Sequence, residues 1–138
     1  RLGAHVVVVA PPALLPKNIE SWGVEVRNTI DDVVGEVDAL YMLRMQLERM
    51  DSSIVPKLTE YCALYSLTPE RAARMGRGAI LMHPGPINRG VELIVDPADV
   101  PGSRILKQVT NGVNVRMAVL FTLLGSGATT VLQQGGES

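Results

Sequence analysis

Three short runs of apolar residues, spaced far apart along the chain, constrain the fold more than any other feature of the sequence. They cover residues 6–9, 39–43 and 79–82, and none of them alternates apolar with polar residues. Such runs are typical of strands in a parallel sheet that is covered on both faces. We therefore expect an α/β fold: an open, doubly wound parallel sheet of Rossmann-like type, with helices on both faces.

Helix signals fill the segments between these strands. Thr68, Pro69 and Glu70 supply, in order, a capping side chain, a first-turn proline and an acid. The expected strands are residues 5–9, 24–26, 39–43 and 79–82, and the expected helices are residues 16–22, 29 to 35 or 37, 52 or 53 to about 62, one that begins at 69, and 104–124. The Gly-Ser-Gly sequence at 125–127 is expected to end the last helix. All 138 residues are expected to form one domain, with residues 133–138 as a flexible tail.

Charge and cysteine content exclude several classes of protein. Thirteen Lys and Arg against fourteen Asp and Glu leave a net charge of −1, which argues against a nucleic-acid binder. A single cysteine, Cys62, excludes an intramolecular disulfide framework and a multi-cysteine zinc site. The longest apolar runs, residues 6–15 and 117–124, are shorter than the roughly 20 residues that a membrane-spanning helix requires.

The chain begins at Arg1, without a methionine, and reaches its first apolar run a few residues later. A basic start before an apolar stretch is also a property of signal peptides. Four valines ended by Ala-Pro-Pro, however, indicate a buried strand. We therefore expect this chain to be part of a longer protein.

Ligands of open α/β sheets bind beyond the carboxyl ends of the strands, and a polar loop follows the strand at 39–43. Arg44 offers a planar set of donors that suits a carboxylate or phosphate held at two points. Gln46, two residues on, could donate to the same anion. The alternative, which spacing alone slightly favours, is that Arg44 pairs with nearby acids such as Glu48 or Asp51 on a solvated loop.

A second polar loop, residues 83–92, follows the strand at 79–82. Pro84 and Pro86 fix the backbone and have no amide hydrogen, and Gly85 permits close approach, so the loop presents carbonyl oxygens to a ligand that carries an NH₂ group. The alternative is a plain tight turn. His83 is expected to be a packed or capping residue. We expect no carboxylate, cysteine or second histidine beside it, and hence neither a catalytic triad nor a metal site.

Three blocks in the same order and spacing resemble the aspartate-binding half of the catalytic chain in the aspartate carbamoyltransferase family. They are YMLRMQLER at 41–49, HPGPINRGVE at 83–92 and QVTNGVNVRMA at 108–118. The resemblance covers essentially the whole chain. In the related ornithine enzyme the second block resembles His-Cys-Leu-Pro, and Pro84 and Gly85 stand here instead, which favours the aspartate enzyme.

The resemblance implies transfer of a carbamoyl group from carbamoyl phosphate to the amino group of L-aspartate. It implies that Arg44 and Gln46 bind aspartate, and that the Gly85 and Pro86 carbonyls, with Pro84 adjacent, accept from the carbamoyl NH₂. It gives Arg116 and His83 supporting roles, and it makes residues 62–71 a mobile loop that closes over aspartate. No cofactor or metal is implied, and the enzyme is expected to be cytoplasmic.

The carbamoyl-phosphate half of the family's chain, including its Ser-Thr-x-Thr-Arg loop and a second aspartate-binding arginine, is not part of this sequence. The family's sites also take a serine and a lysine from a neighbouring subunit of a homotrimer. We therefore predict that these 138 residues alone have no measurable carbamoyl transfer. Two alternatives stay open: an ornithine-type carbamoyltransferase, and a non-catalytic α/β module that binds anions.

Overall fold

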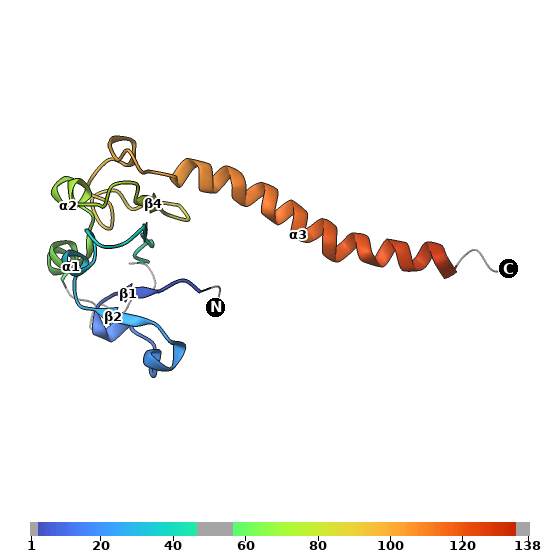
Figure 1. Ribbon diagram of the computed structural model, residues 1–138, viewed down its shortest axis with the longest axis horizontal. Coiled ribbons are helices and arrows are strands. Elements are labelled where there is room, and N and C mark those ends of the chain that lie inside the picture. Colours follow the sequence, from blue (N-terminus) through green and yellow to red (C-terminus); the bar gives the residue numbers. More distant parts are fainter. Residues whose placement is uncertain (1–2, 47–56, 135–138) are drawn as a thin grey trace. The chain divides into compact units, whose positions relative to one another are not determined.

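A computed structural model describes the backbone of residues 3–46 and 57–134, and the side chains of these up to residue 125. The chain divides into two compact units, Arg1–Ile105 and Leu106–Ser138. The first unit contains the strands and the two shorter α-helices, and the described part of the second is a single long helix (Figure 1). The elements in chain order are β1 (Val7–Val9), β2 (Glu25–Arg27), β3 (Ala39–Tyr41), α1 (Leu58–Tyr65), α2 (Pro69–Ala73), β4 (Ile80–Met82) and α3 (Ile105–Gln134), with short 3₁₀ turns at Pro12–Leu14, Ile19–Trp22, Ile30–Asp32 and Pro97–Asp99.

The strands pair in parallel, as the apolar runs predict. β1 pairs with β2, placing Val8 opposite Val26, and β3 pairs with β4, placing Leu40 opposite Leu81. Leu81 also bridges to Ser103 on its other side. The described strands form two separate pairs, so the fold is mixed α/β with small parallel sheets.

The expectation that every strand is covered on both faces is wrong for β3. Its residues alternate between exposed and buried, with Leu40 inside and Tyr41 half exposed. The apolar run therefore has one buried and one exposed face. Composition alone does not distinguish an apolar residue in the core from one at the surface of the unit.

A contiguous apolar core lies around the β3–β4 pair. Leu67, Leu81 and Leu93 are fully buried at its centre, and each is worth roughly 1.5–3 kcal/mol of transfer free energy. Gly102 is required by close packing, because a Cβ atom there would come within 2.1 Å of the Ala79 carbonyl oxygen. The core members are Ile30, Val34, Leu40, Met42, Leu67, Leu81, Leu93, Val95, Val100 and Ile105.

Two of the expected caps are present. The Thr68 hydroxyl accepts from the Arg71 amide at 3.3 Å, and Pro69 opens α2. Thr29 and Asp32 form a reciprocal capping box, but only the 3₁₀ turn Ile30–Asp32 follows, where a helix to residue 35 or 37 was expected. A cap therefore marks where a helical turn begins and says little about its length. The helix expected to begin at residue 52 or 53 begins at Leu58, and residues 47–56 lie outside the described residues.

The helix expected over residues 104–124 is α3, and the prediction that residues 125–127 end it is wrong. The backbone stays helical to Gln134. A glycine within a helix costs only about 1 kcal/mol, which does not by itself end the helix. Residues 133 and 134 of the expected tail are helical, and residues 135–138 lie outside the described part. Among the described residues, no helix combines the length and the hydropathy needed to cross a membrane.

Candidate functional site

The two polar loops meet at the carboxyl end of the β3–β4 pair. Arg44 follows β3, and His83 directly follows β4. Because these strands are parallel neighbours, their ends lie together, and the pairing extends beyond them through a 2.9 Å hydrogen bond from the Met42 amide to the Met82 carbonyl. The structure therefore brings the first and second polar loops to one edge.

Asn88 joins the two loops. Its Oδ1 accepts from Nε of Arg44 at 3.3 Å, and its Nδ2 donates to the Met45 carbonyl at 2.7 Å. Its backbone amide donates to Oε1 of Glu92 at 2.6 Å. One side chain in the second loop thus contacts both the side chain and the backbone of the first.

His83 lies beneath the second loop and is completely buried. Its Nδ1 accepts from the Gly85 amide at 2.8 Å, and its Nε2 lies 3.2 Å from Oε1 of Glu92. Because Nδ1 is an acceptor, the ring proton belongs on Nε2, which donates to the carboxylate. His83 is therefore the packed, capping residue that the sequence favoured.

The expectation that no carboxylate lies near His83 is wrong, because Glu92 is its direct neighbour. Glu92 is fully buried, and within the described residues its Oε2 has no hydrogen-bond partner. The sequence does contain a signal: Glu92 is a lone acid at the head of the apolar stretch that continues through residue 95. A buried acid within an apolar stretch requires polar partners, and the loop residues nearest in sequence supply them.

The Glu92 carboxylate also affects Tyr61, a residue of α1. Burial in the first place, and the Glu92 carboxylate after it, raise the pKa of the Tyr61 phenol from 10.0 to about 12. Tyr61 stacks on Tyr65 with ring centroids 5.2 Å apart, and both pack with Met45 of the first loop. α1 therefore supplies an apolar surface against which residues of both loops pack.

The end of the second loop is held to the α1–α2 connection. The Leu67 amide donates to the Glu92 carbonyl at 2.9 Å, and the Ser66 hydroxyl donates to the Val91 carbonyl. Within residues 62–71, which the resemblance makes a mobile loop, α1 ends at Tyr65 and α2 begins at Pro69. This stretch therefore lies against the candidate site and is largely helical.

The apex of the second loop is exposed. Pro84, Gly85 and Pro86 all lie at the surface, and Gly85 has a φ of +70°, a conformation that favours glycine. The bond between Gly85 and Pro86 is cis. In the part of the chain that the structure describes, no hydrogen bond ends on the Gly85 or Pro86 carbonyl oxygen. These oxygens can accept from a ligand.

Gln46 is exposed beside Arg44, which is half-buried. Arg116 is exposed on α3, in the second unit, and its predicted supporting role stays a prediction. Glu48 and Asp51, the alternative partners of Arg44, lie outside the described residues. No group of three His, Cys, Asp or Glu side chains that could hold a metal ion occurs among residues that the structure describes.

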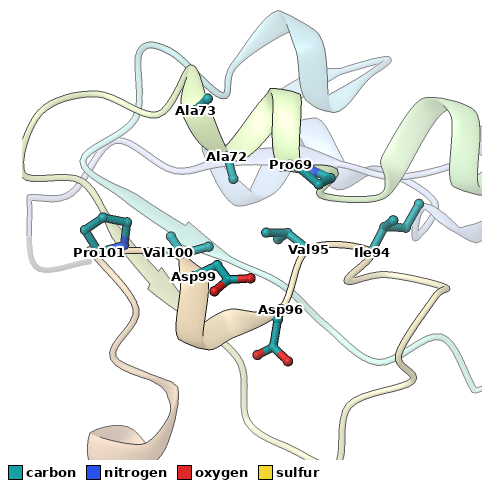
Figure 2. Close-up of a pocket in the computed structure, with 9 residues that line it drawn as sticks. All are labelled: Pro69, Ala72, Ala73, Ile94, Val95, Asp96, Asp99, Val100 and Pro101. Atoms are coloured by element: carbon teal, nitrogen blue, oxygen red, sulfur yellow. The ribbon is translucent and has the colours of Figure 1, made fainter.

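A separate cavity of about 380 Å³ lies beside α2 (Figure 2). α2 lines it with Pro69, Ala72 and Ala73, and residues 94–101 line it with apolar side chains and the carboxylates of Asp96 and Asp99. Asp96 is already engaged by the Ala98 amide and by Arg89. None of the sequence-predicted site residues lines this cavity, so the candidate site stays at the two loops.

Comparison with known proteins identifies the family of the chain. The family described as "Aspartate/ornithine carbamoyltransferase, Asp/Orn binding domain" matches residues 1–123. The aspartate carbamoyltransferase catalytic subunit of Desulfitobacterium hafniense is 48% identical over 131 residues, which cover 95% of this chain and 42% of that protein. The corresponding subunit of Beutenbergia cavernae is 51% identical over 127 residues, which cover 91% of this chain and 38% of that protein.

Solved structures show the same fold. Aspartate transcarbamoylase from Trypanosoma cruzi in complex with carbamoyl phosphate matches with a TM-score of 0.69 at 29% identity, over 84% of this chain and 39% of that one. Ornithine carbamoyltransferase from Pyrococcus furiosus matches with a TM-score of 0.66 at 22% identity, over 87% of this chain and 42% of that one. The chain spans about two fifths of the length of the relatives it matches. The chain belongs to the aspartate/ornithine carbamoyltransferase family, and it corresponds to the family's Asp/Orn-binding domain.

Proposed function

We propose that this chain is the aspartate-binding part of an aspartate carbamoyltransferase. The observation that carries the proposal is the convergence of Arg44 with the second loop at the end of β3 and β4. The named relatives at 48% and 51% identity are aspartate carbamoyltransferase catalytic subunits, which supports aspartate over ornithine. Pro84 and Gly85 stand where the second block of the ornithine enzyme resembles Cys-Leu, which supports the same choice.

In this proposal, the Arg44 guanidinium binds a carboxylate of aspartate, with Gln46 beside it. The Gly85 and Pro86 carbonyls accept from the NH₂ of carbamoyl phosphate, and Pro84 restricts the loop backbone just before them. The amine of aspartate then attacks the carbamoyl carbon, the bond to the phosphate oxygen breaks, the amine loses a proton, and N-carbamoyl-L-aspartate and phosphate leave. The contribution of this chain is to hold amine and carbonyl together in a reactive geometry.

We propose further that the complete catalytic chain is a cytoplasmic homotrimer and that residues 1–138 form one aspartate-binding domain within it. Within the first unit, we propose that the two strand pairs form one parallel sheet with β1 beside β3. Val9 at the end of β1 packs with Met45, Tyr61 and Tyr65, and it lines the same small cavity as Leu40 of β3. This proximity supports the order β2-β1-β3-β4.

Kinetics of the complete protein test the proposal. We expect carbamoyl transfer to L-aspartate and none to L-ornithine, and no transfer by residues 1–138 alone. Arg44→Ala is expected to raise KM for aspartate about 10- to 100-fold, because a charge-assisted, two-point contact is lost. The Kd of carbamoyl phosphate is expected to stay within about twofold of the unsubstituted value, since a change below 0.5 kcal/mol is typical of a residue that does not touch the ligand.

Arg27→Ala is the matched control, because Arg27 is exposed on β2 and pairs with Glu25 at the surface. It is expected to change neither constant. Equal loss of affinity for both substrates in Arg44→Ala, or turnover of ornithine, would contradict the proposal. Binding of anions without any turnover would favour the non-catalytic module.

A further inference from the structure

The structure assigns a positioning role to Asn88: it orients the Arg44 guanidinium for the substrate carboxylate and couples it to the loop that presents the Gly85 and Pro86 carbonyls. This inference rests on the proposed function of Arg44. Its structural basis is the set of hydrogen bonds that link Arg44, Asn88, Glu92 and His83, which we call the loop network.

The amide of Asn88 has one orientation only. Its Oδ1 faces the guanidinium of Arg44, which can only donate, and its Nδ2 faces the carbonyl of Met45, which can only accept. A flipped amide would set donor against donor and acceptor against acceptor. Asparagine is therefore matched to both partners, one on the side chain and one on the backbone of the first loop.

The contact with Nε restricts the guanidinium plane of Arg44. Rotation about the last side-chain bonds would break the bond to Oδ1, and the Met45 contact prevents Asn88 from following. With Nε engaged, a carboxylate that binds at two points is directed to the Nη1–Nη2 edge. Asn88 therefore lowers the entropy cost of immobilising the Arg44 side chain when aspartate binds.

The backbone of Asn88 is fixed from below. Its amide and Nε2 of His83 both donate to the same oxygen of Glu92, and Nδ1 of His83 accepts from the Gly85 amide. Glu92 and His83 are fully buried, so water is excluded from the hydrogen bond between their side chains. A displacement of Gly85 is therefore transmitted through His83 and Glu92 to Asn88, and from there to Arg44.

A double-mutant cycle in the complete protein tests this role. Asn88→Ala is expected to raise KM for aspartate about tenfold, which is the effect of losing one hydrogen bond to a charged group. The Kd of carbamoyl phosphate is expected to change by less than about twofold. In an Arg44→Ala background, the same substitution is expected to change KM for aspartate by less than about twofold, because the residue through which Asn88 acts is absent.

Asn28→Ala is the matched control, since Asn28 is an exposed asparagine of the same unit, and no change of KM is expected. An unchanged KM in Asn88→Ala, or the same fold increase in both backgrounds, refutes the positioning role alone. Equal weakening of both substrates also refutes it, because that result indicates general disruption of the second loop. Absence of aspartate turnover in the unsubstituted protein refutes the proposed function, and this role with it.

Discussion

Two hydrogen-bond networks in the first unit each centre on a carboxylate but lie in opposite surroundings. The loop network centres on Glu92, which is 0% exposed, as is its partner His83. The Asp31 network comprises Asp31, Arg71 and Arg74, and its carboxylate is 41% exposed. Both place a carboxylate between two donor groups, so burial is the main difference between them.

Burial changes what each network contributes. Removing the acceptor of a buried hydrogen bond leaves its donor unsatisfied, which costs about 1–3 kcal/mol for each donor. An exposed pair is screened by water and contributes about 0–1 kcal/mol. The buried network therefore dictates the conformation of the candidate site, whereas the exposed one reinforces a surface that can form without it.

The largest effect is expected from Glu92→Ala. It removes the acceptor that the Asn88 amide and Nε2 of His83 share, so both of these hydrogen bonds are lost. We expect a destabilisation of about 3 kcal/mol, seen as a fall in Tm of roughly 5 °C in thermal unfolding of the complete protein. Glu36→Ala, at an exposed position of the same unit, is the control and is expected to leave Tm unchanged. An equal Tm for the two variants would mean that the loop network contributes no more than the surface does.

A smaller effect is expected from Asp31→Ala. Arg71 keeps its bonds to the Ala63 and Ser66 carbonyls at 2.6 and 2.7 Å, and so continues to brace the end of α1. We expect a loss of about 1 kcal/mol, after allowing for solvent screening, and an unchanged KM for aspartate. A loss as large as that of Glu92→Ala would remove the distinction between the two networks.

The pH dependence of that loss can also be predicted. The hydrogen bond from Arg71 lowers the pKa of the Asp31 carboxyl below its ordinary value of 3.8, so the folded state binds this proton less readily than the unfolded state. The stabilisation is therefore complete above the unfolded pKa and disappears as the pH falls through the folded one. The difference in Tm between the unsubstituted protein and Asp31→Ala should be constant above about pH 5 and shrink below about pH 4. A difference that grows in acid would contradict this assignment.

The sequence predicted the position of the site better than its internal contacts. Parallel pairing follows from the apolar runs of β3 and β4, and it brings Arg44 and His83 together without knowledge of any loop. Asn88 and Glu92 were missed as partners because their contacts depend on how an irregular loop folds back on itself. Nothing in the periodicity of residues 83–92 specifies that path.

Some helix ends could likewise be predicted from the sequence and others could not. Thr68-Pro69 and Gly23 act locally, so the start of α2 and the end of the Ile19–Trp22 turn were predicted correctly. The length of α3 and the shortness of the Ile30–Asp32 turn depend on competition along many residues, which a single cap or glycine does not decide. The exposed Leu106 and Phe121 of α3 show equally that an apolar residue in the sequence need not lie in the core of its own unit.

The smallest effect is expected at the ion pair of Arg89 and Asp96, which is more exposed than the Asp31 network. The hydrogen bond from the Ala98 amide is the main cause that lowers the pKa of the Asp96 carboxyl, and the hydrogen bond from Arg89 lowers that pKa further. Both side chains of the ion pair are more than 40% exposed, at 68% and 49%, so water screens their attraction. Arg89→Ala should therefore leave Tm unchanged within error, whereas Asp96→Ala, which also removes the cap of the Pro97–Asp99 turn, should lower it slightly. Thermal unfolding of both variants at low and high salt checks this, and a salt-sensitive loss in Arg89→Ala would show that an exposed pair can contribute as the Asp31 network does.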